Sequence, residues 1–338
     1  MKKIFFIGRF PPPYGGATIK SEMLYKMLLK NFNVEKFDTE SKNDSKIKFL
    51  LKLLIFLFNN RKNNGVICIA TESLFKFTKY INSLFEGMLG NISVFAIGGE
   101  LDELIKEYKM NIEILKKYKV IYVECSGIKE KLNYLGLHNV EVVPNCRTKP
   151  IKRKYVHNNS NKELKCLFIS RIDKNKGIFK IIDCFKEDIS KDITVDFYGP
   201  IDEDIYNDFY MEVNNNPLIS YKGIIESNKI DIYSIIKEYD LLLFPTEYKE
   251  GYPGIISEAK IAGIPIITSN FRYSKEIIEN YKDGIILEEN TKEELYNLIN
   301  KLNQDRELLT SIRYNSFLSG EKCFIEFYMD KIIEKLDN

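Results

Sequence analysis

The stretch DLLLFPTEYKEGYPGIISEAKIAGIPIIT, residues 240–268, contains the pattern that decides the fold class of this chain. Residues 240–246 form an apolar run short enough for a buried parallel strand, and residues 264–268 form a second one. Between them lie a glycine-rich turn and an apolar segment, Gly254–Ala262, that has the length of a helix. This order is typical of an open α/β sheet, in which the turn lies at the carboxyl edge where ligands bind.

Two carboxylates, Glu250 and Glu258, frame this turn. Free amides at the start of the following helix favour an anion such as phosphate. A helical side chain leans toward the amino end of its helix, so Glu258 is expected to point at the same ligand. Because carboxylates repel phosphate, both glutamates are expected to accept hydrogen bonds from hydroxyl groups. The pattern therefore indicates a nucleotide sugar, and the alternative is a capped helix start with one solvated glutamate.

The composition excludes several classes of protein. A length of 338 residues favours two domains, and 44% hydrophobic with 29% charged residues is ordinary for a globular protein. The six cysteines form no C-x-x-C pair and lie mostly in apolar runs, which predicts reduced, buried thiols in a cytoplasmic protein rather than disulfides or a zinc site. Only two histidines are present, so a histidine-rich metal centre is not expected.

The charge is unevenly distributed. Residues 1–150 carry 24 Lys and Arg against 15 Asp and Glu, a net charge of +9, and residues 151–338 carry 26 against 33, a net charge of −7. The longest apolar run, residues 49–58, is too short to span a membrane. Basic residues flank it as in a helix lying on anionic lipid: Lys42, Lys46, Lys48, Lys52, Arg61 and Lys62. The alternative is an amphipathic helix packed on the sheet. One helix can do both, with one face on the sheet and another on lipid.

Strand-like and helix-like runs alternate along the chain, which predicts two parallel sheets with helices on both faces. The polar, asparagine-rich segment of residues 147–163 is the best linker between two domains. Helices are expected over residues 18–30, 100–118 and, last in the chain, 321–336. Strands are expected over residues 3–8, 34–39, 66–71, 93–98, 120–125, 140–144, 164–170, 193–199, 218–224, 240–245, 264–268 and 284–289.

Three further loops follow expected strands. Arg171 and Lys176 lie in one loop at the same sheet edge as Glu250, where two cations suit a pyrophosphate, although such a loop alone is more often a solvated turn. In the first half, residues 11–16 (PPPYGG) form a stiff loop whose glycines admit a ligand. The pair Gly98-Gly99 before Glu100 is either a ligand contact or a tight turn. Dinucleotide and ATP fingerprints are missing.

These motifs together resemble family 4 of the glycosyltransferases, the retaining enzymes with the GT-B fold. The resemblance rests on PPPYGG, the R-x4-K-G loop, EGYPGIISEAKIAGIPII, the run KEII at residues 275–278 and the pair Pro144-Asn145. It covers nearly the whole chain in the right order. The E-x7-E segment with its trailing A-x-x-A-G-x-P is highly specific, and the N-terminal motifs are less so.

The resemblance implies an α/β architecture of two Rossmann-like doubly wound domains facing across a cleft. Residues 1–150 would form the acceptor-side domain, and residues 151–338 the nucleotide-sugar-binding domain, with the last helix a candidate to cross back. Arg171 and Lys176 would neutralise the diphosphate, Glu250 would contact the donor sugar, and Glu258 would contact the ribose. Amides of the segment Tyr252, Pro253, Gly254 and Ile255 would hold the sugar and phosphate, and Gly15 with Gly16 would close over the diphosphate.

One position departs from the family pattern. Many relatives carry a histidine near the end of the fourth strand, where this chain has Gly98, Gly99 and Glu100. Neither His138, in a helix-to-strand turn, nor His157, in the linker, can substitute by position. The histidine role is therefore unassigned, and Gly99 and Glu100 are candidates to contact sugar or acceptor.

The resemblance implies a cytoplasmic enzyme that moves a sugar from a nucleotide sugar, UDP-linked rather than GDP-linked, without a metal or other cofactor. The expected acceptor is a glycan or lipid-linked glycan of surface polysaccharide or lipopolysaccharide assembly. The basic domain would dock on an anionic membrane surface, and no nucleic acid partner is expected. Two alternatives stay open: a GT-B UDP-sugar epimerase, and a non-catalytic protein that binds sugar nucleotides or membrane surfaces.

Overall fold

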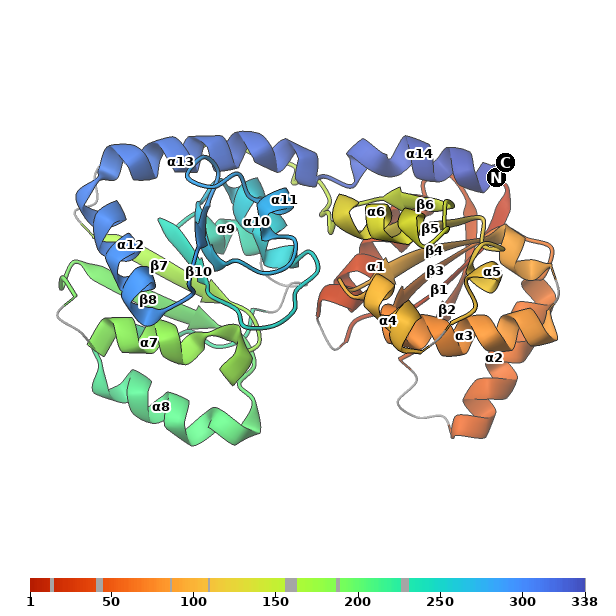
Figure 1. Cartoon of the computed structure of the whole chain (residues 1–338), viewed down its shortest axis with the longest axis horizontal. Coiled ribbons are helices and arrows are strands. Elements are labelled where there is room, and N and C mark those ends of the chain that lie inside the picture. Colours follow the sequence, from red (N-terminus) through yellow and green to blue (C-terminus); the bar gives the residue numbers. More distant parts are fainter. Residues whose placement is uncertain are drawn as a thin grey trace. The chain divides into compact units, whose positions relative to one another are not determined.

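The chain folds into two units, each with its own parallel sheet (Figure 1). One unit comprises Met1–Thr148 together with Phe324–Asn338, and the other comprises Lys149–Cys323. The closing segment of the chain thus belongs to the first unit. This computed structural model describes residues 1–12, 15–40, 45–85, 87–108, 110–155, 163–186, 189–225 and 231–337. Tyr14, Lys42 and His157 of the sequence argument lie outside these residues.

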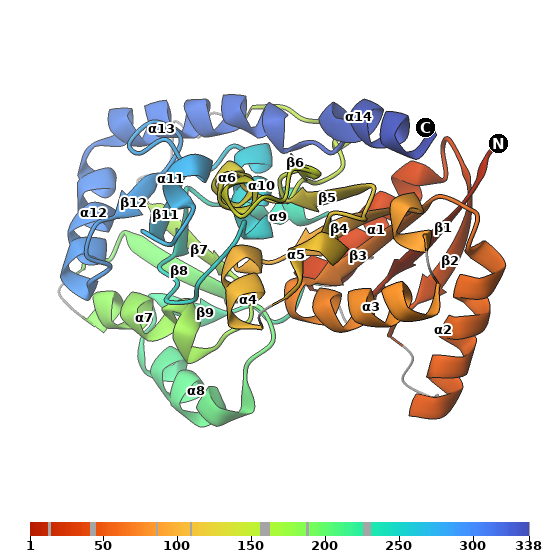
Figure 2. The ribbon, with the colours of Figure 1, turned by 45° about the vertical axis from the view of Figure 1, so that its right-hand side comes forward.

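The sheet of the first unit has six parallel strands in the order β2-β1-β3-β4-β5-β6. In β1, five of six residues are buried, as expected of a strand covered by helices on both faces (Figure 2). The strands are β1 (Lys3–Gly8), β2 (Asn33–Asp38), β3 (Gly65–Ala70), β4 (Ile92–Ile97), β5 (Val120–Val123) and β6 (Val140–Val142).

The helices of the first unit follow the strands in alternation. They are α1 (Gly16–Leu28), α2 (Lys46–Asn60), α3 (Thr71–Leu84), α4 (Leu101–Glu107), α5 (Ile112–Leu115), α6 (Ser126–Tyr134) and α14 (Glu326–Asp337), with one 3-10 turn, η1 (Met88–Asn91). The prediction of one helix over residues 100–118 is wrong. The side chain of Asn111 accepts a hydrogen bond from the amide of Glu113 at 2.9 Å and starts a new helix, α5.

The last helix completes the core of the first unit. Ile325, Met329, Ile332 and Leu336 are buried in the same apolar cluster as Phe6 of β1. This helix begins at Glu326 rather than at residue 321, because residues 320–323 form a separate 3-10 turn, η4 (Gly320–Cys323).

The second unit has a sheet of six parallel strands in the order β12-β11-β10-β7-β8-β9. All twelve strands of the two units lie where the sequence predicts them, with ends that differ by up to three residues. The strands are β7 (Leu164–Ile169), β8 (Ile193–Tyr198), β9 (Ile219–Tyr221), β10 (Leu241–Phe244), β11 (Ile266–Ser269) and β12 (Ile285–Leu287). The helices are α7 (Ile178–Lys186), α8 (Tyr206–Asn215), α9 (Ile232–Ile236), α10 (Gly254–Ala262), α11 (Ser274–Ile277), α12 (Lys292–Gln304) and α13 (Arg306–Ser319), with the 3-10 turns η2 (Lys174–Lys176) and η3 (Glu203–Ile205).

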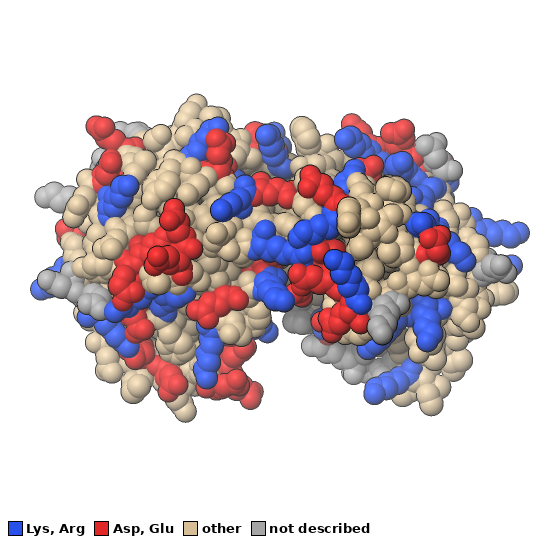
Figure 3. Space-filling view, viewed as in Figure 1, with Lys and Arg blue, Asp and Glu red and all other residues tan. Residues whose placement is uncertain are grey.

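The cysteines follow the sequence expectation of reduced, buried thiols. All six cysteines are free and buried. Burial raises the pKa of the Cys68 thiol to about 11, so this thiol stays protonated at neutral pH. No helix among the described residues is long and apolar enough to cross a membrane. On the face drawn in Figure 3, basic side chains gather over the first unit and acidic side chains over the second.

Each unit contains a buried ion pair that joins a helix to its sheet. In the first, Lys20 Nζ of α1 lies 2.7 Å from Glu124 Oε1, directly after β5, and their side chains are 2% and 3% exposed. In the second, Arg313 of α13 donates to Asp240 Oδ1 at 3.2 Å, while Asp240 Oδ2 accepts from the amide of Lys165 at 3.0 Å. A charge left alone at either place would lack compensation for its desolvation.

We predict that Lys20→Met or Glu124→Leu alone destabilises the first unit by about 3–5 kcal/mol, because each leaves an unpaired buried charge. The double variant is expected to recover most of this loss, since two apolar side chains need no partner. Calorimetric unfolding of the wild type, the two single variants and the double variant measures this double-mutant cycle. The exposed pair Glu113 and Lys116 is the matched control, and its removal is expected to cost less than about 1 kcal/mol. Additive losses in the double variant at the buried site would contradict the prediction.

Candidate functional site

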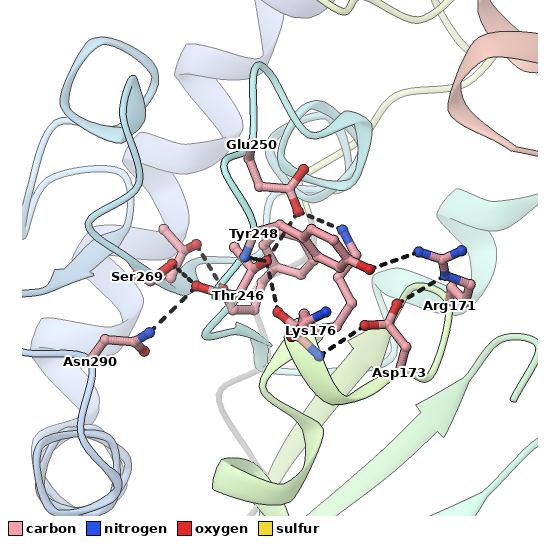
Figure 4. Close-up of polar contacts among 11 residues, drawn as sticks. Arg171, Asp173, Lys176, Thr246, Tyr248, Glu250, Ser269 and Asn290 are labelled. Atoms are coloured by element: carbon pink, nitrogen blue, oxygen red, sulfur yellow. Dashed lines mark hydrogen bonds and ion pairs between the residues drawn. The ribbon is translucent and has the colours of Figure 1, made fainter. Parts of the chain in front are cut away.

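The candidate site lies at the carboxyl edge of the second sheet, where two loops meet (Figure 4). Strands β7 and β10 are direct neighbours, with Leu241 opposite Cys166 and Leu242 opposite Leu167. The loops that follow these strands therefore start side by side. The amide of Glu247 donates to the carbonyl of Asn175 at 2.7 Å, which joins the two loops through their backbones.

The loop after β7 has a fixed shape. Asp173 is 4% exposed, and its carboxylate accepts from the amide of Asn175 and from Arg171 Nε, both at 2.9 Å. Gly177 ends the turn with φ = 74°, and a Cβ there would lie 2.2 Å from the carbonyl oxygen of Pro245. Only glycine fits both this conformation and this approach. The R-x4-K-G sequence is thus a folded unit pressed against the loop after β10, which sets the position of Lys176.

Lys176 and Glu250 are in direct contact. Lys176 Nζ lies 2.5 Å from Glu250 Oε1, and the two side chains are 14% and 16% exposed. Thr246 Oγ1 donates to the same oxygen at 3.1 Å. The sequence predicts both residues at this edge, and the structure brings them together as an ion pair. An anion that binds Lys176 must therefore share or replace its contact with Glu250.

Tyr248 connects the two cations of the site, and the sequence analysis missed it. Its hydroxyl accepts from Arg171 at 3.1 Å, and Lys176 Nζ lies 4.7 Å from the centre of its ring. A cation at this distance from an aromatic ring is attracted by its π face. The sequence signal for Tyr248 is only an aromatic residue between Thr246 and Glu250, and no motif assigns it a role.

Arg171 is the more accessible cation of the site. Its side chain is 52% exposed, and Nε lies 3.9 Å from Asp202 Oδ1 in addition to its contact with Asp173. Burial lowers the pKa of Arg171, but the hydrogen bond and charge of Asp173 outweigh it and raise the pKa overall. Arg171 is therefore charged at every pH at which the protein is folded, and its exposed guanidinium can bind an anion.

Two side chains hold the backbone of Thr246, which lies in the same loop as Glu250. Its carbonyl accepts from Oγ of Ser269, the last residue of β11, at 2.5 Å and from Asn290 Nδ2 at 3.4 Å. Its hydroxyl lies 3.4 Å from the carbonyl of Asn175 and accepts from the amide of Tyr248 at 3.2 Å. The loop is thus fixed before any ligand binds, as a preorganised site requires.

Helix α10 carries the second glutamate. Pro253 precedes the helix as its N-cap, and Gly254 and Ile255 form its first turn, whose amides lack carbonyl partners within the helix. Glu258 lies in the second turn and is 7% exposed. Burial raises the pKa of the Cys323 thiol, and hydrogen bonding by Ser257 and Tyr252 opposes this rise.

A buried lysine in the last turn of α10 fixes the position of this helix. Lys260 Nζ lies 2.6 Å from Asp283 Oδ2 and donates to the carbonyl of Ile277 at 2.7 Å. These contacts anchor the last turn of α10.

The predicted residues of the first unit lie at the carboxyl edge of their own sheet. Gly15 caps α1, its amide bonded to Thr18 Oγ1 at 2.9 Å, and a Cβ on Gly15 or Gly16 would meet nothing within 4 Å among the described residues.

After β4, Gly98 adopts φ = 120°, Gly99 is buried, and Glu100 is the half-buried N-cap of α4. His138 is exposed and directly precedes β6, at the amino edge of this sheet, opposite to Glu100. It cannot reach the position of the family histidine. In the part of the chain that the structure describes, no three His, Cys, Asp or Glu side chains gather as metal ligands.

Comparison with known proteins agrees with this geometry. The family model described as glycosyl transferases group 1 matches residues 151–318, the segment with both loops of the site. The capsular polysaccharide biosynthesis glycosyltransferase CapM of Staphylococcus aureus is 27% identical over 175 residues, which are 51% of this chain and 45% of CapM. An Escherichia coli UDP-Gal:alpha-D-GlcNAc-diphosphoundecaprenol alpha-1,3-galactosyltransferase is 26% identical over 107 residues, 32% of this chain and 27% of the enzyme. This chain thus spans less than half the length of either relative.

The fold is shared over the whole length of a solved structure. The crystal structure of Anabaena HepE in complex with UDP-glucose superposes with a TM-score of 0.72 over 100% of both chains, at 14% sequence identity. At this identity the likeness establishes the GT-B fold and not the reaction. The two six-stranded parallel sheets described above are the two domains of that fold.

Proposed function

Because residues 151–318 match the family model of the group 1 glycosyl transferases, we propose that this chain transfers a sugar from a UDP-linked donor to a glycan or lipid-linked glycan. The observation that carries the proposal is the contact between Lys176 and Glu250, with Arg171 close by. Cations for a diphosphate and a carboxylate for sugar hydroxyls lie on one rigid edge. The names of the E. coli relative and of the HepE complex support a UDP-linked donor.

Arg171 and Lys176 would act on the leaving group. As the bond from the anomeric carbon to the diphosphate breaks and a bond to the acceptor oxygen forms, negative charge grows on the diphosphate. Fixed cations stabilise that charge without reorganising during the reaction. Two of them at one edge make a metal ion unnecessary, and we propose transfer with retained configuration and without a metal.

The two glutamates would divide the recognition of the donor. Once the diphosphate occupies Lys176, Glu250 is free to accept hydrogen bonds from the hydroxyls of the donor sugar, held in place by Thr246. Glu258, one turn into α10, would accept from the ribose. The amides of Gly254 and Ile255 in the first turn would bind the sugar and phosphate between them.

The acceptor would be a lipid-linked glycan of surface polysaccharide assembly at the cytoplasmic face of a membrane. The E. coli relative is named for a diphosphoundecaprenol acceptor, and CapM for capsular polysaccharide biosynthesis. The net charge of +9 in residues 1–150 suits peripheral binding to an anionic leaflet.

The decisive experiment is an assay of the purified chain with UDP-sugars and GDP-sugars. A nucleotide sugar present at 100 times its dissociation constant should stabilise the fold by about 2.7 kcal/mol, which a thermal-shift panel detects. Donor hydrolysis or transfer, unchanged by a chelator, would support the proposal. Release of an epimerised nucleotide sugar would identify the epimerase alternative, and binding without turnover would identify the non-catalytic one.

We predict that Lys176→Ala and Arg171→Ala each lower turnover by about a hundredfold or more, the usual cost of losing one preformed partner of a developing charge. Neither cation belongs to the core, so both variants should unfold as the wild type does. Lys174→Ala is the matched control, because Lys174 is an exposed cation of the same turn, and it should retain activity. Near-normal turnover in both site variants would remove the diphosphate assignment.

We predict that the two glutamates affect UDP binding and sugar transfer differently. Glu258→Gln should weaken binding of UDP alone, because its partner is the ribose. Glu250→Gln should leave UDP binding intact or tighten it, since Lys176 loses its competing carboxylate, while transfer falls. Calorimetry with UDP and a transfer assay separate the two effects, and Glu247→Gln in the same loop serves as the control. Equal losses of UDP binding in both site variants would show that the roles are wrongly divided.

A further inference from the structure

Helix α2 of the first unit has two apolar faces, and only one of them is covered. Phe56 and Leu57 are buried, and the ring of Phe56 lies 5.1 Å from that of Phe37 and 6.1 Å from that of Phe5 in the sheet. Five other large apolar residues of α2 are more than half exposed: Ile47 (75%), Leu50 (53%), Leu51 (55%), Ile55 (61%) and Phe58 (55%). The sequence analysis left open whether this helix packs on the sheet or meets lipid, and the structure provides a separate face for each.

The exposed residues form one continuous stripe. They lie three, four, eight and eleven positions after Ile47, the spacing of side chains on one side of a helix. At about 100° per residue, the buried residues Phe56 and Asn60 point roughly away from the stripe, whereas the buried Leu57 lies at its edge, close to Leu50. Single exposed apolar residues are common, but a contiguous row of this kind marks an interaction surface. In Figures 1 and 2, the amino-terminal part of α2 extends beyond the sheet.

The charges around the stripe have a single sign. Residues 45–62 contain five Lys or Arg and no Asp or Glu. Lys48 and Lys52 are exposed and follow one another at the border between the stripe and the buried face. At the other end, the guanidinium of Arg61 lies 4.2 Å from the ring centre of Phe58 and donates to its carbonyl at 2.7 Å.

We propose that α2 is an interfacial helix that inserts this stripe into an anionic lipid leaflet. The apolar side chains would enter the acyl boundary, while the lysines reach back to lipid phosphates with their long aliphatic stems along the helix. With 15 residues, α2 is about 22 Å long and would lie in the plane of the membrane rather than cross it.

The charge pattern favours lipid over a second copy of this chain and over a protein partner as the surface that covers the stripe. A second copy of this chain would bring two purely basic helices together, which the repulsion of like charges disfavours. A protein partner of the usual kind would meet a surface rich in lysine, the residue type that protein interfaces avoid. An anionic leaflet offers both the apolar layer and the negative charge that the helix needs.

Flotation of the full chain with vesicles tests the proposal. With vesicles of phosphatidylglycerol and phosphatidylcholine at low salt, the wild type should float, and with pure phosphatidylcholine it should float much less. The variant Ile47→Gln/Leu51→Gln/Ile55→Gln should lose at least tenfold in its partition coefficient. The variant Lys46→Gln/Lys48→Gln/Lys52→Gln should bind more weakly and lose most of its dependence on salt.

Two controls keep the result specific to α2. Tyr80→Gln/Leu84→Gln removes two exposed apolar residues of α3, which are 66% and 57% exposed, and it should float as the wild type does. All replaced side chains are exposed, so the thermal midpoints should stay close to the wild type. Hydrolysis of a soluble nucleotide sugar should also be unchanged, which separates this proposal from the proposed enzymatic function.

Three outcomes would overturn the proposal. The first is a wild-type chain that does not float at low salt. The second is a stripe variant that floats as well as the wild type, or an α3 control that loses as much binding as the stripe variant. The third is a wild-type dimer that the stripe variant converts to a monomer in size-exclusion chromatography, which would assign the stripe to a second copy.

Discussion

The parallel pairing of β10 with β7 is the constraint on which the site depends. It places two loops from distant parts of the sequence on one edge, where Lys176 Nζ lies 2.5 Å from Glu250 Oε1. Asp240, at the start of β10, accepts from the amide of Lys165 and thus fixes the register of this pair. A slip by one residue would reverse the faces of the side chains in β10 and misplace the loop. The absence of a side chain at Gly177 then lets the loops close on one another.

Most of the fold could be predicted from the sequence, because parallel strands covered on both faces appear as uninterrupted apolar runs. Helix α10 was bounded correctly because Pro253 precedes it and Gly263 ends it in a left-handed conformation with φ = 78°. The break between α4 and α5 was missed, because a local cap at Asn111 prevailed over a pattern compatible with one helix. Local capping is a matter of one hydrogen bond, and apolar periodicity does not report it.

The site was predictable in its residue types but not in its contacts. Arg171, Lys176 and Glu250 could be placed at one sheet edge from the order of strands and loops. Their mutual neutralisation could not, since it depends on the register between two strands and on the shape of two turns. Tyr248 was overlooked for the same reason: its contact with Arg171 exists only once the loops lie side by side. The exposed apolar stripe of α2 could not be predicted either, because a sequence of apolar residues does not show which of them the sheet covers.

The return of α14 to the first unit has a consequence for folding during synthesis. The second unit, Lys149–Cys323, is continuous, so the ribosome releases all of its residues before the last segment appears. The first unit lacks Ile325, Met329, Ile332 and Leu336 of its core until these residues emerge. Domains generally fold as units in the order of their synthesis. Here that order is inverted: the domain that begins the chain is the last one able to close its core, and until then its apolar surface remains open to chaperones.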